Sequence, residues 1–427
     1  MDKIIFTFTL LFFTLLVLNT GRNTKSSSDF SLGGRQAMSF SVTATIVGTM
    51  VGGASTIGTV QMAYTYGLAA WIFTLGCSIA CLLLGLFFAA PMRNRDTITI
   101  SEYIGHYFGK NFRKYSSILT SAGIFIHIIA QILASAAIIM IIFNLNLKTA
   151  SFFSTILLGI FVLSGGIKST AFVGKIKIFM LYILTFGCFL IALVKGNGLN
   201  NVISQLPEGT KWLSLFSYGS KKASIDLVSM VIGVLATQTY LQAIFSAKNV
   251  KEARKGAFIS AAIIPPIGLF GVFVGMYLRV YHPEIASSNT AALPFFIQQY
   301  FPGILSDILM VFMLIIILGT GSGLCLGIIT NIYNDVLGAG KFSEKYDILK
   351  MRVIGTALLM MAFFVVLAEL NNTILEWSYL SMGLRGSATF IPLIMCIFIP
   401  GITKNLYIRA VVYILPLIYL AASFIHF

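Results

Sequence analysis

Long apolar runs separated by short polar segments make up almost the whole chain. Each run is long enough for a transmembrane helix, which needs about 17–25 apolar residues. The predicted spans are 4–20, 39–65, 68–91, 116–143, 151–166, 176–195, 226–247, 257–280, 303–333, 351–369, 376–399 and 409–426. This pattern predicts an all-α polytopic membrane protein with about twelve transmembrane helices.

Glycine and hydroxyl residues interrupt the second of these spans. The segment Gly48-Thr-Met-Val-Gly-Gly-Ala-Ser-Thr-Ile-Gly58 lies in the middle of an otherwise apolar run. The hydrocarbon core offers no water for unpaired backbone groups, so a helix broken there is expected to face a cavity. A second polar cluster, at 233–242, lies in the seventh span. Broken helices of this kind form ion and substrate sites in secondary transporters.

The spans also suggest an internal symmetry. Without the first and last spans, ten remain, in two groups of five that begin at opposite faces of the membrane. Two such groups are what an inverted repeat requires. The predicted regions are 1–38 (N-terminal helix and cytoplasmic loop), 39–195 (first repeat), 196–225 (extracellular connection, carrying a short surface helix or a gate), 226–399 (second repeat) and 400–427 (C-terminal helix).

Composition excludes a soluble protein, since 57% of the residues are hydrophobic and 10% are charged. The net charge of +15 does not require a nucleic-acid partner. Most basic residues are assigned to the inner face, including Lys168, Lys175 and Lys177 around the start of the sixth span. The positive-inside rule therefore predicts both termini outside.

Two alternatives concern the first span and the cysteines. The first span could be a signal peptide, but no small-residue cleavage site follows it, so a retained helix is expected. The five cysteines all fall within spans. Cys77 and Cys81 lie one turn apart and could bind metal, but no second ligand pair accompanies them, which favours a packing role.

Four segments, in order, are similar to motifs of the sodium:solute symporter family. They are Ser28-Asp-Phe-Ser-Leu-Gly-Gly-Arg35, Gly52–Gly67, Thr97–Tyr103 with Phe108-Gly109, and Gln238–Arg254. Tyr107 and Ala243 stand where the family has arginine. The resemblance implies a LeuT-type 5+5 inverted repeat with one extra helix at each end. It also implies alternating-access symport of a small solute driven by sodium.

The resemblance also implies a sodium site. Its ligands would be the carbonyls of Gly48 and Val51 in the first core helix and two adjacent hydroxyls in the eighth. The register places Thr320 at the second hydroxyl position but Gly319 at the first, where no side-chain oxygen exists. Ser322 or a water molecule could substitute. Alternatively, the Gly-Thr-Gly-Ser-Gly run serves close helix packing.

The family places the solute beside the broken helices. His127, Gln131 and Ser135 recur every fourth residue, so they share one face of the third core helix. That face lines the solute cavity or makes hydrogen bonds between helices. The candidate substrate residues are Ser55, Thr56, His127, Gln131, Gln238, Tyr240 and Arg385.

Arg385 is the most informative of these. It follows Glu376-Trp377, at the outer end of its span, by about nine residues, and a rise of about 1.5 Å per residue places it near mid-membrane. A buried arginine requires a partner. That partner could be a substrate carboxylate or an internal group such as Asp226, Asp307 or backbone carbonyls.

The leading hypothesis is a sodium-coupled transporter of a small polar or carboxylated solute in the plasma membrane. Its expected partners are the solute, sodium and the lipid bilayer, with a monomer sufficient for transport and no other cofactor. The alternatives are proton-coupled or uncoupled transport, and a solute sensor that acts through a partner chain. An intramembrane enzyme is not expected, because the sequence has neither an H-x-x-x-H pair nor paired intramembrane carboxylates.

Overall fold

The computed structural model describes residues 3–20, 27–163, 166–285, 291–338, 344–368 and 374–426. Within these ranges the chain is helical, apart from loops and an isolated bridge between Ala37 and Ala247. By length and composition, eight helices of the described chain can cross a membrane, and four shorter apolar helices accompany them. The all-α class is therefore confirmed, while the number twelve stays a prediction.

The helices follow one another with short connections. The longer ones are α1 (Lys3–Thr20), α3 (Ser39–Met50), α4 (Thr59–Tyr66), α5 (Ile72–Leu83), α8 (Lys110–Phe143), α9 (Leu147–Leu163), α10 (Gly166–Lys195), α12 (Ser220–Leu235), α13 (Gln238–Ser246), α14 (Val250–Tyr281), α16 (Gly303–Asn331), α17 (Glu344–Leu367), α18 (Ile374–Phe398) and α19 (Leu406–His426). Short helices between them are α2 (Ser27–Leu32), α6 (Ala89–Arg93), α7 (Ile100–Phe108), α11 (Leu199–Ser204) and α15 (Ala292–Tyr300).

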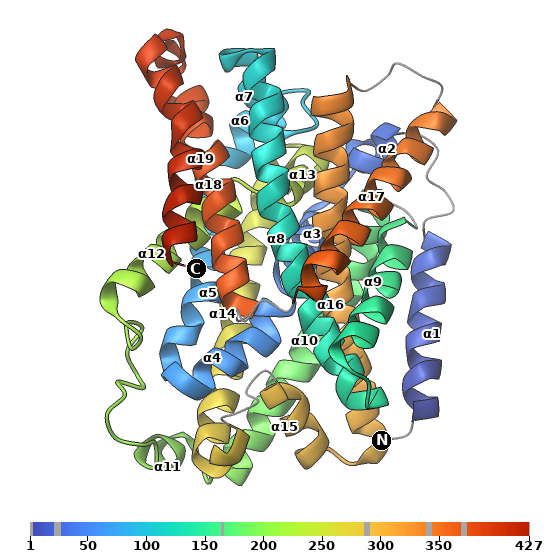
Figure 1. Cartoon of the computed structure of the whole chain (residues 1–427), viewed down its shortest axis with the longest axis vertical. Helices are drawn as coiled ribbons and strands as arrows, with labels where there is room; N and C mark the ends of the chain where they lie inside the picture. Colours follow the sequence, from blue (N-terminus) through green and yellow to red (C-terminus); the bar gives the residue numbers. More distant parts are fainter. Residues whose placement is uncertain are drawn as a thin grey trace.

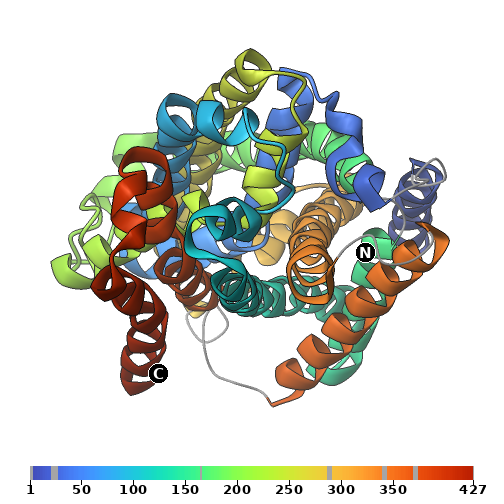
Figure 2. The same ribbon diagram turned by 90° about the horizontal axis from the view of Figure 1, so that it is seen from above.

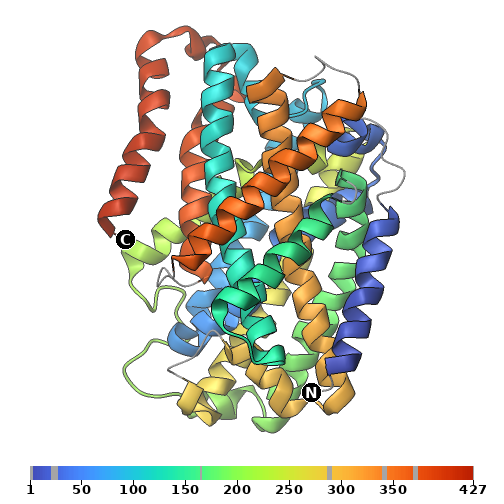
Figure 3. The same ribbon diagram turned by 45° about the vertical axis from the view of Figure 1, so that its right-hand side comes forward.

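The centre of the bundle is built around α8 and α16 (Figure 1). Helix α8 packs against α18 on one side and α16 on the other, and α10 packs against α3 and α16. Seen from above, α1, α17 and α19 lie at the periphery (Figure 2). Figure 3 shows α17 running obliquely across the outside of the bundle, next to α9. Residues on the central helices are thus shielded from lipid by other helices.

The predicted interruption of the second span is confirmed. Helix α3 ends at Met50, and Val51 has the extended angles φ −91° and ψ 100°. A π-helical turn, Ala54–Gly58, then leads into α4. Because the chain leaves the α-helical path at Val51, carbonyl oxygens just before the break are available to partners outside their own helix.

The seventh predicted span is interrupted as well. Helix α12 ends at Leu235, and the chain resumes as α13 at Gln238. Between them Thr237 is extended, with φ −92° and ψ 120°. The first core helix of each predicted repeat is therefore broken in the middle of the bundle, as transporters with a central site require.

The boundary predicted for the sixth span is wrong. Helix α10 begins at Gly166 rather than near residue 176, so Lys177 lies about three turns inside it. Lys177 is fully buried, with 0% of its surface exposed, whereas Lys168 is exposed. Three lysines in ten residues suggested a loop. On the helix, Lys168 and Lys175 are seven residues apart and share one face, whereas Lys177 lies on nearly the opposite face, toward the bundle interior.

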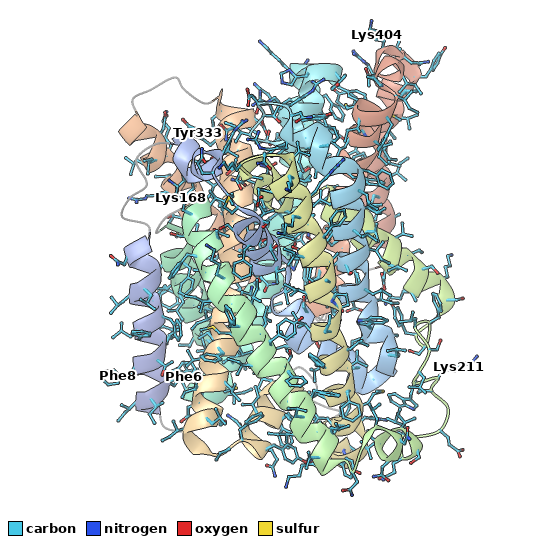
Figure 4. All side chains as sticks on the ribbon, turned by 180° about the vertical axis from the view of Figure 1, so that it is seen from behind. Phe6, Phe8, Lys168, Lys211, Tyr333 and Lys404 are labelled. Carbon is cyan, nitrogen blue, oxygen red and sulfur yellow. The ribbon has the colours of Figure 1, made fainter. Side chains whose placement is uncertain are left out.

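The long connection after α10 contains the predicted short helix, α11. Further along, the carbonyl of Trp212 accepts a hydrogen bond of 2.8 Å from the backbone amide of Leu68, just after α4. Figure 4 shows Lys211, in this connection, in the half of the molecule opposite Lys168 and Lys404. The connection thus covers the end of the first broken helix, while its role as a gate stays a prediction.

Candidate ion and substrate sites

The groups predicted to bind sodium do converge. Thr320, on α16, faces the break between α3 and the π-helical turn. Its hydroxyl oxygen lies 3.1 Å from the carbonyl oxygen of Val51 and 3.4 Å from that of Gly48. All of these residues are buried. We refer to the oxygens of Gly48, Val51 and Thr320 as the three-oxygen site.

The amino group of Lys177 reaches into this site. Its Nζ donates a hydrogen bond of 2.6 Å to the carbonyl of Gly48 and another bond to the hydroxyl of Thr320. The sequence analysis missed this residue because it placed Lys177 in a loop. Its position in the sixth span could have indicated burial, because the helix that contains it packs against the first core helix.

Two glycine contacts explain why Lys177 reaches so far. Gly48 and Gly174 face each other where α3 crosses α10, and a Cβ added to Gly48 would lie 2.7 Å from the Cα of Gly174. Lys177 follows Gly174 by one helical turn, so its stem starts next to the broken helix. The absent side chain of Gly319 leaves room on α16, because a Cβ there would lie 3.5 Å from Cδ of Lys177 and 3.9 Å from its Nζ.

Ser322 does not join the three oxygens. Its hydroxyl donates a hydrogen bond of 3.0 Å to the carbonyl of Gly319, in its own helix. The substitute ligand proposed from the sequence is thus engaged locally, and the position left open by Gly319 is bordered by the lysine stem.

Arg385 is the largest fully buried side chain described, with 0% of its surface exposed. Its guanidinium lies between α8, α18 and the break before α13. It donates hydrogen bonds to the Thr237 hydroxyl at 2.8 Å, the Ser381 hydroxyl at 2.8 Å, the Ser381 carbonyl at 3.1 Å, His127 Nδ1 at 3.2 Å and the Met382 sulfur at 3.1 Å. Every one of these partners is neutral.

The carboxylates considered as partners for Arg385 are not among these contacts. Asp226 accepts a hydrogen bond of 2.9 Å from the Tyr218 hydroxyl instead. Backbone carbonyls were the other internal partners considered for Arg385, and the carbonyl of Ser381 accepts a hydrogen bond from it. Room for the arginine is provided by Gly123 on α8, since a Cβ there would lie 2.6 Å from Cγ of Arg385.

Unused hydrogen-bond donors lie close to Arg385. A guanidinium can only donate, so Nδ1 of His127 accepts from it, and the proton of the neutral ring must be on Nε2. That Nε2 is buried and has no hydrogen-bond partner in the described structure. One turn along α8, the Gln131 carbonyl oxygen accepts a bond of 3.0 Å from the amide of Gly53, leaving Nε2 of Gln131 without a partner. The hydroxyl of Ser55 is also buried without one.

The remaining substrate candidates differ in position. Tyr240, on α13, is fully buried, and its hydroxyl has no hydrogen-bond partner in the described structure. Thr56 donates to the carbonyl of Gly52 in its own segment at 2.9 Å. Gln238 is engaged elsewhere, because it accepts from the amide of Ile100 and donates to the carbonyl of Ile98, both at 2.9 Å. Sequence reasoning missed Thr237 and Ser381, although Thr237 belongs to the polar cluster that it identified.

A cluster of charged residues, which we call the α7 latch, connects the start of α7 to two other helices. Arg113, on α8, pairs with Asp335 at 2.7 Å and with Glu102 at 3.4 Å. Asp335 also accepts a hydrogen bond of 2.8 Å from the hydroxyl of Thr99, which caps α7. Thr99 and Glu102 belong to the motif Thr97–Tyr103. The latch ties together α7, α8 and the π-helical segment Ile332–Gly338 that follows α16.

Two broken helices that surround buried polar groups, in a bundle of membrane-length helices, define a multi-pass membrane transporter of LeuT-type fold. The structure of a Na⁺-coupled sialic acid symporter in a substrate-bound, outward-open state superposes with a TM-score of 0.78 at 16% identity, covering 93% of this chain and 86% of that one. The sequence itself matches the model of the sodium:solute symporter family over residues 30–406. The chain belongs to the sodium:solute symporter family.

Curated relatives match over part of the chain. An uncharacterized symporter from Bacillus subtilis, YwcA, is 26% identical over 262 residues, which is 60% of this chain and 51% of the relative. A high-affinity choline transporter from Drosophila melanogaster is 26% identical over 272 residues, or 60% of this chain and 44% of the relative. The chain thus matches about half the length of these relatives.

Proposed function

We propose that this protein is a secondary active transporter that moves a small carboxylated solute across the plasma membrane by alternating access. The solute would bind beside Arg385, between α8, α18 and the break before α13. A cation gradient would drive the uptake. Both termini would face outward, and one chain would suffice for transport.

The observation that carries this proposal is the charge of Arg385. A buried cation is costly unless an opposite charge compensates it, and all hydrogen-bond partners of Arg385 in the described structure are neutral. A planar carboxylate matches the guanidinium fork. The unpartnered groups of His127, Gln131 and Ser55 add hydrogen-bond donors, which suit an acceptor-only ligand.

The same charge disfavours a cationic solute. Choline is the solute named for one relative, and a quaternary ammonium next to a buried guanidinium would meet like-charge repulsion in a medium of low dielectric constant. We therefore infer a different solute class for this chain.

The coupling ion is the second part of the proposal. Membership of the sodium:solute symporter family makes sodium the first candidate. Neutral oxygens such as those of Gly48, Val51 and Thr320 suit a weakly held monovalent cation. Lys177 bears directly on this assignment, because its ammonium contacts two of the three oxygens.

Uptake by proteoliposomes tests the solute class. Radiolabelled acetate, pyruvate, lactate, proline, glucose and choline would be compared under an imposed sodium gradient and, separately, an imposed proton gradient. We expect a carboxylate to accumulate and choline not to. Replacing Arg385 by glutamine should weaken carboxylate uptake by about tenfold or more, since a hydrogen bond to a charged group contributes about 1.5–3 kcal/mol.

Arg254→Gln is the matched control, because Arg254 is exposed at the start of α14. Size-exclusion chromatography would show that each variant is folded. Uptake of choline but of no carboxylate, or an Arg385→Gln variant that is folded and retains full carboxylate affinity, would contradict the proposed solute class.

A further inference from the structure

Lys177 lies where a coupling ion is expected. Its Nζ is 2.6 Å from the carbonyl oxygen of Gly48 and hydrogen-bonded to the hydroxyl of Thr320. A sodium ion bound to the same oxygens would need the volume that the ammonium fills. Two positive charges in contact also repel strongly where the dielectric constant is low. Sodium and the Lys177 ammonium therefore exclude each other from this site.

The missing hydroxyl at position 319 fits the same arrangement. The family pattern has two adjacent hydroxyls here, and this chain keeps only Thr320. A Cβ on Gly319 would already lie 3.5 Å from Cδ of Lys177 and 3.1 Å from Cγ1 of Val173. The position that lacks a sodium ligand is therefore next to the side chain of Lys177. Two unrelated sequence changes would not be expected to fall at the same place.

Other charges do not account for a buried lysine here. Helix α3 contains no titratable side chain, and the central part of α16 carries only Cys325. Helix α14, which also packs on α10, has its charged residues at its two ends: Lys251, Glu252, Arg254 and Lys255 at one and Arg279 at the other. On α10 itself, Lys168 and Lys195 lie toward the ends, Lys175 is partly exposed on the side of the helix away from Lys177, and Tyr182 donates to a carbonyl of α14. The ammonium is held by neutral oxygens alone.

We propose that the Lys177 ammonium takes the place of sodium in the three-oxygen site, so that no sodium ion binds there. This inference rests on the cation-coupled transport proposed above and excludes the three-oxygen site as the place where sodium binds. A tethered ammonium cannot be released into the cell as sodium is.

Sodium binding tests the occupancy without any knowledge of the solute. Purified wild-type protein would be equilibrated with radiolabelled sodium, with potassium as the competing salt at constant ionic strength. We expect no sodium binding that depends on Thr320. In the double variant Lys177→Ala/Gly319→Ser, which removes the ammonium and restores the second hydroxyl, we expect sodium to bind and to raise the melting temperature. A further Thr320→Ala change should abolish both effects.

The double variant could fail to fold, so Lys177→Ala alone is the second variant, since it opens the site without adding a side chain. Sodium binding measured on the wild-type protein tests the proposal whether or not the variants fold. Wild-type protein that binds sodium, with binding lost in Thr320→Ala, would overturn the proposal, because Lys177 would then leave the site to the ion.

Transport tests the same point. The carboxylate found by the uptake screen would be offered to proteoliposomes with sodium or with potassium outside, and uptake by protein-free liposomes would be subtracted. We expect the Thr320→Ala change to leave any effect of sodium on wild-type uptake unaltered, because the three-oxygen site of the wild type holds no sodium. A sodium stimulation of wild-type uptake that is lost in Thr320→Ala would overturn the proposal. Absence of any carboxylate transport would refute the proposed function instead, and the sodium-binding result would still stand.

Discussion

The backbones of Gly48 and Gly174 are in direct contact, and this contact sets the position of Lys177 relative to the broken helix. A side chain at Gly174 would not fit, because its Cβ would lie 2.0 Å from the carbonyl oxygen of Ala44. We therefore expect Gly174→Ala to push α10 away from α3 and to destabilise the protein by about 1–3 kcal/mol, the usual cost of overpacking. Thermal unfolding in detergent measures this.

Gly187→Ala is its control on the same helix. There the nearest atom to an added Cβ is 3.8 Å away, in Phe301. We expect an unchanged or slightly raised melting temperature for Gly187→Ala. If the two variants had equal melting temperatures, α3 and α10 would be packed less tightly at their crossing than the structure shows.

The space beside Arg385 gives a second prediction. A methyl group on Gly123 would lie 2.6 Å from Cγ of Arg385, so Gly123→Ala should displace the guanidinium. We expect weaker carboxylate uptake, seen as a raised half-saturation concentration. Gly159→Ala, on α9, is the control, since its Cβ would make an ordinary contact of 3.5 Å with Leu359. Normal affinity in Gly123→Ala would argue against a solute bound at Arg385.

The two functions of Gln131 can be separated. Gln131→Glu keeps an acceptor for the amide of Gly53 but replaces the free amide donor by a negative charge. We expect a folded protein that no longer takes up the carboxylate. Gln131→Leu leaves the Gly53 amide buried without an acceptor, which costs about 1–3 kcal/mol, so its melting temperature should fall. Full uptake by Gln131→Glu would remove this residue from the substrate site.

The α7 latch gives a fourth prediction. The Asp335 side chain is fully buried, so Asp335→Asn should weaken the contact with Arg113 and loosen the start of α7. Ser101, which is 2% exposed in the first turn of α7, would be changed to cysteine as a reporter. We expect maleimide to label this cysteine faster in the Asp335→Asn background.

Glu102→Gln is the comparison for the latch. The Glu102 pair with Arg113 is longer, at 3.4 Å, and both side chains are partly exposed, so water screens it and its loss should matter less. Labelling that is as slow in Asp335→Asn as in the parent protein would mean that the Arg113–Asp335 pair does not hold α7.

Much of the architecture could be predicted from hydrophobic runs and from glycine. The break at Val51 and the break at Thr237 follow from helix-breaking or polar residues inside apolar segments, which is a local property of the chain. The approach of Thr320 to Gly48 and Val51 followed from resemblance to a family rather than from any local pattern. The burial of Arg385 followed from its distance to the end of its span.

Lys177 shows why the rest could not be predicted. A lysine two residues inside a predicted span reads as the charged end of a helix, because long basic side chains usually reach toward the interface. Its true environment depends on where α10 begins and on the contact between Gly48 and Gly174, which are far apart in sequence. The partners of Arg385 were missed for a similar reason, since Thr237 and Ser381 come from different helices and neither stands out alone.

The attachment of the Lys177 ammonium to the polypeptide has one more consequence. A dissolved ion fills its site according to its activity in the medium, whereas a tethered group is present at a local concentration fixed by the chain. The three-oxygen site would then carry the same positive charge at low and at high sodium concentration. The salinity of the surroundings would not determine whether this site is filled.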